Sequence, residues 1–111
     1  MSKFDDVVAK AAEQLGKVGV KADDQLVRAV AKSQGPSIYL KDASLVSCGD
    51  DAELKRVADN FIVKKLGVTN ETDIKKVLDG TCAKFKPVKM KMRIAFYYSI
   101  VKDLKKEAIF A

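Results

Sequence analysis

The sequence contains no histidine and no tryptophan. Histidine is the side chain whose unperturbed pKa lies near neutrality, and it is the commonest general acid–base and a frequent metal ligand. Its absence makes an enzyme less expected. No GxGxxG motif is present either, so no pattern predicts a dinucleotide site. We therefore expect no enzymatic activity, no catalytic residue, no metal site and no cofactor.

Cysteine is scarce, and long apolar runs are missing. Cys48 and Cys82 are the two cysteines, and they stand 34 positions apart without CxxC spacing. We expect two reduced thiols used as small apolar residues in a cytoplasmic protein, and no disulfide. No window approaches the ~20 apolar residues of a membrane span, and an acidic pair at Asp5 and Asp6 argues against an export signal. We expect no membrane association.

The charge of the chain is unevenly placed. The net charge is +6, with 48% apolar and 32% charged residues, which is typical of a soluble globular protein. Residues 1–63 carry 9 Lys and Arg against 10 Asp and Glu, whereas residues 64–111 carry 12 against 5. The basic C-terminal half indicates either an anionic partner or a device for solubility.

Apolar residues recur at helical spacing over most of the chain, and its 111 residues suffice for a single domain. We predict helices at about 3–15, 23–34, 51–66 and 70–86, and a last helix from about 94. Ser2 can cap the first helix, Thr69 or Asn70 can cap the fourth, and Gly35 with Pro36 ends the second helix. The sequence therefore predicts an all-α bundle of about five helices over residues 1–111.

The last helix is apolar nearly all round. One stripe runs through Tyr97 and Val101 and a second through Phe96 and Ile100, so we expect this helix to be central and largely buried. If its neighbours leave one stripe uncovered, that stripe could pair with a second copy as a homodimer or with another protein. Residues 88–93 alternate apolar and basic residues at strand spacing, so an extended start is left open.

A structured connection, Gly35 to Asp51, separates the second and third helices. We expect one or two helical turns in it, pinned by its apolar residues, Ile38, Leu40, Leu45 and Val46. Asp50 followed by Glu53 predicts a capping box at the start of the third helix.

Three stretches resemble a family of small bacterial proteins catalogued as a domain of unknown function: GPSIYLKDASLVS (35–47), NFIVKKLG (60–67) and AFYYSIVKDL (95–104). The similarity covers nearly the whole chain. It implies a single all-helical cytosolic domain and no known activity, so it assigns no catalytic or binding residue.

The basic segment KFKPVKMKMR is the strongest functional signal in the sequence. Cations at the positive N-terminal end of the last helix are unfavourable unless an anion lies among them, which favours phosphate or nucleic-acid binding. The alternative without a binding role is a solvated lysine-rich turn whose charge keeps the protein soluble. The candidate anion ligands are Lys84, Lys86, Lys89, Lys91 and Arg93.

The connection is the second candidate site. Its polar side chains could line a small-ligand pocket, and long connections between helices are often functional. The candidate ligand-binding residues are Ser37, Tyr39, Lys41 and Asp42. The YxxxK spacing of Tyr98 and Lys102, and the SxxK spacing of Ser99 and Lys102, lack companion motifs, so we interpret these residues as packing residues. The function predicted is a small binding or protein-interaction module whose partner the sequence does not identify.

Overall fold

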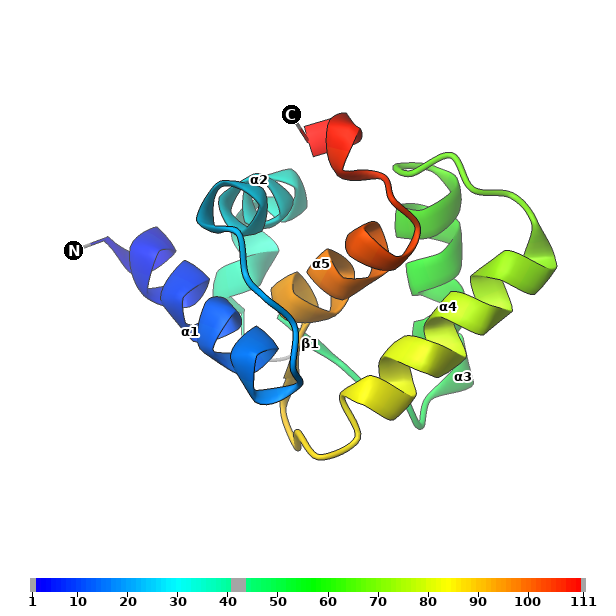
Figure 1. Cartoon of the computed structure of the whole chain (residues 1–111), viewed down its shortest axis with the longest axis horizontal. Coiled ribbons are helices and arrows are strands. Elements are labelled where there is room, and N and C mark those ends of the chain that lie inside the picture. Colours follow the sequence, from blue (N-terminus) through cyan, green and yellow to red (C-terminus); the bar gives the residue numbers. More distant parts are fainter. Residues whose placement is uncertain (1, 41–43, 111) are drawn as a thin grey trace.

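Five α-helices, three shorter helical segments and two short strands make up residues 2–40 and 44–110, the part described by the computed structural model (Figure 1). In chain order they are α1 (Lys3–Lys17), α2 (Asp24–Gln34), η1 (Gly35–Tyr39), β1 (Leu45–Val46), α3 (Asp51–Val57), η2 (Ala58–Val63), α4 (Glu71–Lys84), β2 (Lys91–Met92), α5 (Arg93–Asp103) and η3 (Glu107–Phe110). The predicted all-α class is confirmed.

The helix starts follow local capping rules. Side-chain oxygens of Ser2, Asp23, Asp50 and Asn70 each accept a hydrogen bond from a backbone N–H in the first turn of the helix that follows. The backbone of Gly35 has a φ of 69°, a left-handed conformation that glycine adopts without strain, and α2 ends there as predicted.

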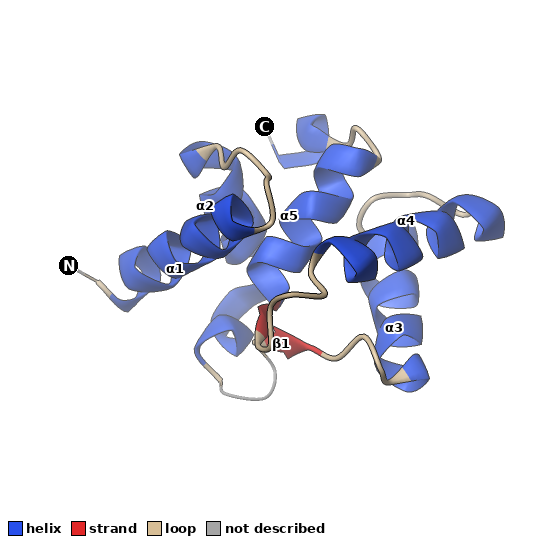
Figure 2. Cartoon of the chain, turned by 60° about the horizontal axis from the view of Figure 1, so that its bottom comes forward, coloured by secondary structure: helices blue, strands red, loops and turns tan. Residues whose placement is uncertain are grey.

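Helix α5 is the central element of the fold. It lies between the α1–α2 pair and the α3–α4 side of the molecule (Figures 1 and 2). Every residue from 94 to 101 is buried, including Phe96 and Ile100, which have no exposed surface. The expected central position is therefore confirmed. Phe96 and Ile100 of the second stripe and Tyr97 and Val101 of the first are all buried within the chain, so the condition set for pairing through an uncovered stripe is not met at these residues.

Strand β1 pairs with β2 in an antiparallel ladder, with Leu45 opposite Met92 and Val46 opposite Lys91. This short ribbon brings the connection beside the start of α5 (Figure 2). The strand spacing of residues 88–93 is thus expressed as an extended start, and α5 begins at Arg93. Of the apolar residues expected to pin the connection, Ile38 and Val46 are buried, whereas Leu40 is 58% exposed.

The two cysteines are joined, which corrects the prediction of two reduced thiols. The Cys48–Cys82 disulfide links the turn before α3 to α4, with the Cα atoms 5.9 Å apart. A separation of 34 residues does not reveal this proximity. The two cysteines come together because β1 carries the connection across to the C-terminal end of α4.

The third predicted helix is continuous but not uniform. Its α-helical part ends at Val57, and η2 continues it as a π-helix, in which Leu66 N donates to Phe61 O and Lys64 N donates to Asp59 O. Each π-type bond spans one more residue than an α-helical bond, so side chains after Val57 are turned relative to the expected stripe. Single π turns of this kind are frequent at functional sites.

Candidate functional site

The basic segment does not gather its cations at one point. Lys84 Nζ pairs with Asp103 at 3.5 Å and donates to Ser99 Oγ at 3.1 Å. Lys91 Nζ donates to the carbonyl oxygen of Val88 at 2.8 Å. Three of the five predicted anion ligands are therefore engaged within the chain, the third being Arg93, whose contacts are described below.

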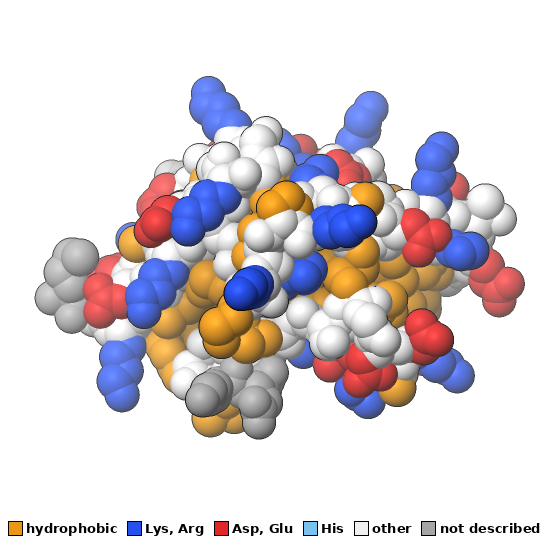
Figure 3. Space-filling view, turned by 90° about the horizontal axis from the view of Figure 1, so that it is seen from below, with side chains coloured by type: hydrophobic (Ala, Val, Ile, Leu, Met, Phe, Trp, Pro, Cys, Tyr) orange, Lys and Arg blue, Asp and Glu red, His pale blue; other side chains and the backbone are white. Residues whose placement is uncertain are grey.

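The remaining lysines of the segment, Lys86 and Lys89, are exposed. Lys89 and Lys91 line a hollow of 370 Å³, but the carboxylate-bearing Glu53 lines it too. On the face that contains the turn between α4 and β2, basic and acidic side chains are interspersed and form no continuous basic stripe (Figure 3). The structure thus disperses the predicted anion site.

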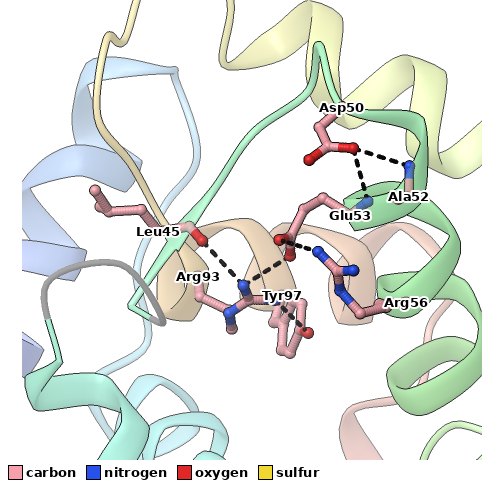
Figure 4. Close-up of polar contacts among 7 residues, drawn as sticks. All are labelled: Leu45, Asp50, Ala52, Glu53, Arg56, Arg93 and Tyr97. Carbon is pink, nitrogen blue, oxygen red and sulfur yellow. Dashed lines mark hydrogen bonds and ion pairs between the residues drawn. The ribbon is translucent and has the colours of Figure 1, made fainter.

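Arg93 opens α5, and its guanidinium ties three segments together (Figure 4). Nη2 donates to the carbonyl oxygen of Leu45 at 2.9 Å and to Glu53 Oε1 at 2.7 Å. Nη1 donates to the hydroxyl of Tyr97 at 3.0 Å. The Arg93 and Glu53 side chains are each only 15% exposed, so the pair is largely withdrawn from water. Arg93 is therefore a clamp between β1, α3 and α5, with its charge already balanced.

Glu53 is held by two arginines. Burial disfavours its charged form, but the hydrogen bond and charge of Arg93, and then those of Arg56, outweigh burial, so the pKa of Glu53 lies below its ordinary value. The predicted capping box is half correct. Asp50 caps Ala52 and Glu53 as expected, but the Glu53 carboxylate is engaged by the arginines (Figure 4). The backbone N–H of Asp50, the group that a capping-box glutamate would accept from, donates instead to the carbonyl oxygen of Ser47 at 3.3 Å.

Two aromatic rings stack beside this clamp. The centroids of Phe61, from the π-helix η2, and Tyr97, from α5, lie 3.9 Å apart with an interplanar angle of 16°. Burial raises the pKa of Tyr97 above its ordinary value, although Arg93 opposes this effect. The Tyr97 hydroxyl therefore stays protonated at neutral pH and can donate a hydrogen bond while accepting one from Arg93.

A pocket of 420 Å³ opens between the end of α2, η1, η2 and the start of α5; we call it the Gln34 pocket. Its volume lies in the ordinary range of small-ligand sites. Its lining contains two cationic residues and no acidic residue. The lining residues are Ser33, Gln34, Ser37, Asn60, Phe61, Lys65, Arg93 and Tyr97.

The side-chain amide of Gln34 is the unusual group of this pocket. Both Nε2 and Oε1 are inaccessible to solvent, and neither has a hydrogen-bond partner among the described residues. Leaving a buried donor or acceptor unpaired costs about 1–3 kcal/mol, and such groups are rare in native proteins. Both atoms are covered in this conformation, although Gln34 belongs to the lining of the pocket.

The predicted ligand-binding loop contributes in part to this pocket. Ser37 lines it, with its hydroxyl donating to the carbonyl oxygen of Gln34 at 2.9 Å. Tyr39 is 45% exposed. Lys41 and Asp42 lie outside the described residues. Of the four predicted loop residues, Ser37 is thus the one that the structure places at this pocket.

Most of the pocket was missed by reasoning from the sequence. Sequence reasoning places Tyr97 in an apolar stripe of the last helix and gives no role to Asn60 or Lys65. No spacing rule joins residues 33–37 to 60–65 and 93–97, and the π turn that redirects η2 has no signature in composition. Ser37, Asn60, Phe61, Lys65 and Tyr97 of the pocket do fall within the stretches that carry the family resemblance, and this was the one available signal.

The short catalytic-looking motifs serve the fold. The Tyr98 hydroxyl accepts a hydrogen bond from Asp23 N at 2.8 Å and donates to the carbonyl oxygen of Lys21 at 3.0 Å, so it anchors the start of α2 to α5. Ser99 is buried and accepts the bond from Lys84. Their role as packing residues agrees with the structure.

Comparison with known families places the chain. The family described as "Protein of unknown function (DUF2853)" matches residues 9–108. The chain belongs to this family. A search of curated proteins finds no match. Among the helices described for this member of DUF2853, none has the length and apolar character needed to cross a membrane.

Proposed function

We propose that this DUF2853 protein is a small-ligand-binding protein without catalysis of its own, and that its binding site is the Gln34 pocket. The observation that carries the proposal is the unpaired amide of Gln34 at the wall of a pocket of ligand size. A chain that keeps an unpaired buried amide gives up stability at that position. A ligand that hydrogen-bonds both amide atoms would recover the loss.

The hydroxyls of the pocket support binding rather than chemistry. Ser33 Oγ donates to the carbonyl oxygen of Val30 at 2.7 Å, and Ser37 Oγ donates to that of Gln34 at 2.9 Å. Neither hydroxyl is directed to a general base, and no histidine exists in the chain to act as one.

The other two predicted activities have weaker support. Phosphate or nucleic-acid binding by the basic segment requires cations that Lys84, Lys91 and Arg93 already use within the chain. Self-association through α5 requires apolar surface that Phe96 and Ile100 do not expose. Both stay predictions.

The cytoplasmic location predicted from the sequence also stays a prediction, and its basis has changed. It depended partly on two reduced thiols, whereas Cys48 and Cys82 are disulfide-bonded. Structural disulfides persist mainly in oxidising compartments. The bond therefore favours either such a compartment or a thiol pair that is oxidised only under stress.

A fragment screen observed by ¹⁵N–¹H correlation spectra tests the proposal. We expect hits to shift the amide resonances of residues 33–37, 60–65 and 93–97 together. Gln34→Met should weaken those hits, whereas Gln14→Met, the same change at a glutamine outside the pocket, should not. Hits that cluster elsewhere, or that bind the Gln34→Met variant equally well, would contradict the proposal.

A further inference from the structure

We infer that the Gln34 pocket binds a small monocarboxylate that also carries a hydrogen-bond donor. This inference depends on the proposed function, because it names the ligand class of the same site. It follows from the charge balance of the lining residues, from the polar groups left without partners, and from the space beside the stacked rings.

The charge of the pocket calls for one negative charge. Its two cationic residues are Lys65 and Arg93, and no acidic residue lines it. Arg93 already pairs with Glu53 at 2.7 Å, and Glu53 is shared with Arg56. Lys65 has no ion-pair partner among the described residues, and its Nζ lies 5.5 Å from the centroid of the Phe110 ring. Lys65 is therefore the pocket cation left for a ligand, and a single such cation suits a monoanion better than a phosphate dianion.

The polar groups define the rest of the ligand. The Gln34 amide is covered in this conformation, and a turn of its side chain toward the pocket would present an N–H donor and a carbonyl acceptor side by side. A complementary ligand then supplies both an acceptor and a donor. The side chain of Asn60, at the exposed rim, forms no hydrogen bond within the described part of the chain and adds a second amide of the same kind. A carboxylate accepts from the amide nitrogens and Lys65, and a neighbouring hydroxyl or N–H group donates to Oε1 of Gln34.

The aromatic pair limits how the ligand lies. Phe61 and Tyr97 stack on each other, and both are largely buried. Their shared faces are unavailable to a flat ligand, so no base is sandwiched as in nucleotide sites. The ligand meets ring edges, where the positive rim of the aromatic quadrupole also favours a carboxylate oxygen.

The test uses three matched pairs that differ in charge and little in shape: acetate and acetamide, lactate and lactamide, and 4-hydroxybenzoate and 4-hydroxybenzamide. Each is titrated into the ¹⁵N-labelled full chain at constant ionic strength, with inorganic phosphate as a separate probe. We expect lactate and 4-hydroxybenzoate to shift residues 33–37 and 60–65, with affinities about tenfold higher than those of their amides. Acetate, which lacks the donor, should bind more weakly than lactate.

Variants tie the effect to the named groups. Lys65→Met should reduce the preference for carboxylate over amide, whereas Lys64→Met, the adjacent lysine outside the pocket lining, should leave it unchanged. Gln34→Met should weaken both members of each pair.

The outcomes separate the ligand class from the site itself. Amides that bind as well as the carboxylates, or phosphate that binds as tightly as lactate, would overturn the monocarboxylate inference while the pocket stays a binding site. The same holds if no carboxylate shifts these residues but other fragments do. If no compound of any class perturbs the pocket, the proposed function fails as well.

Discussion

The unpaired amide of Gln34 allows a prediction of sign as well as size. Methionine matches glutamine in length, has similar helix propensity and carries no strong polar group. Replacing Gln34 by methionine removes two polar atoms that are buried without partners. Because their desolvation costs about 1–3 kcal/mol, we expect the free energy of unfolding to rise by a similar amount. Most core substitutions lower stability, so a rise is a distinctive result.

Gln14 provides a matched control within the same chain. It lies in α1 as Gln34 lies in α2, but its amide is fully used. Nε2 donates to the carbonyl oxygen of Met90 at 2.8 Å, and Oε1 accepts from Met92 N at 2.8 Å. Gln14→Met breaks both bonds and leaves backbone groups of the β2 segment unpaired, so it should lower the free energy of unfolding by about 1–3 kcal/mol.

Urea denaturation monitored by circular dichroism measures both changes. With a urea m-value of about 2 kcal/mol/M, a change of about 2 kcal/mol should raise the midpoint by about 1 M for Gln34→Met and lower it by a comparable amount for Gln14→Met. The reasoning is refuted if both variants lose stability equally. That result would mean that the Gln34 amide is satisfied in solution, and the argument for a ligand at that position would lose its basis.

Three further predictions concern the framework around the pocket. Joint replacement of Cys48 and Cys82 by serine should lower the free energy of unfolding by about 4 kcal/mol, because the disulfide closes a loop of 34 residues. Reduction of the wild-type protein should likewise lower its denaturation midpoint, and equal midpoints with and without reductant would contradict this prediction. Glu53→Gln removes the charge that Arg93 and Arg56 bind and should lower the free energy of unfolding at pH 7 by about 1.5–3 kcal/mol. Because the folded-state pKa of Glu53 is depressed, the wild-type contribution is complete above about pH 4.3 and is lost as the pH falls through the folded pKa, so the variant should show a shallower decline of stability in acid, measured by urea titration at each pH. Parallel pH profiles would exclude this role. Tyr98→Phe removes the hydrogen bonds to Asp23 N and to the carbonyl oxygen of Lys21, and it should lower the free energy of unfolding by about 1–2 kcal/mol. Thermal unfolding measures this loss, and an unchanged Tm would contradict the anchoring role.

Local rules predicted most of the fold. The cap at Ser2, the stop at Gly35 and the all-round apolar pattern of the last helix depend on neighbouring residues, and the structure confirms each. The disulfide and the clamp of Arg93 on Glu53 depend on residues 34 and 40 positions apart, which periodicity does not address. The π turn at residues 58–63 could not be predicted for another reason, because the same residue types continue an α-helix elsewhere in the chain.

Two locally unfavourable features lie at the Gln34 pocket: a cation at the start of α5 and a buried amide without hydrogen-bond partners. They differ in whether another residue of the chain compensates them. A cation in the first turn of α5 opposes the helix dipole, and from this the sequence predicted an anion near Arg93. That anion is Glu53 of the same chain, so the unfavourable position of Arg93 is compensated within the protein and requires no external phosphate. The buried amide of Gln34 is also energetically unfavourable, and no described residue provides it with a hydrogen-bond partner. Natural sequences are expected to violate such rules mainly where function requires it. Of the two, Gln34 is therefore the residue whose partner should be sought outside the chain.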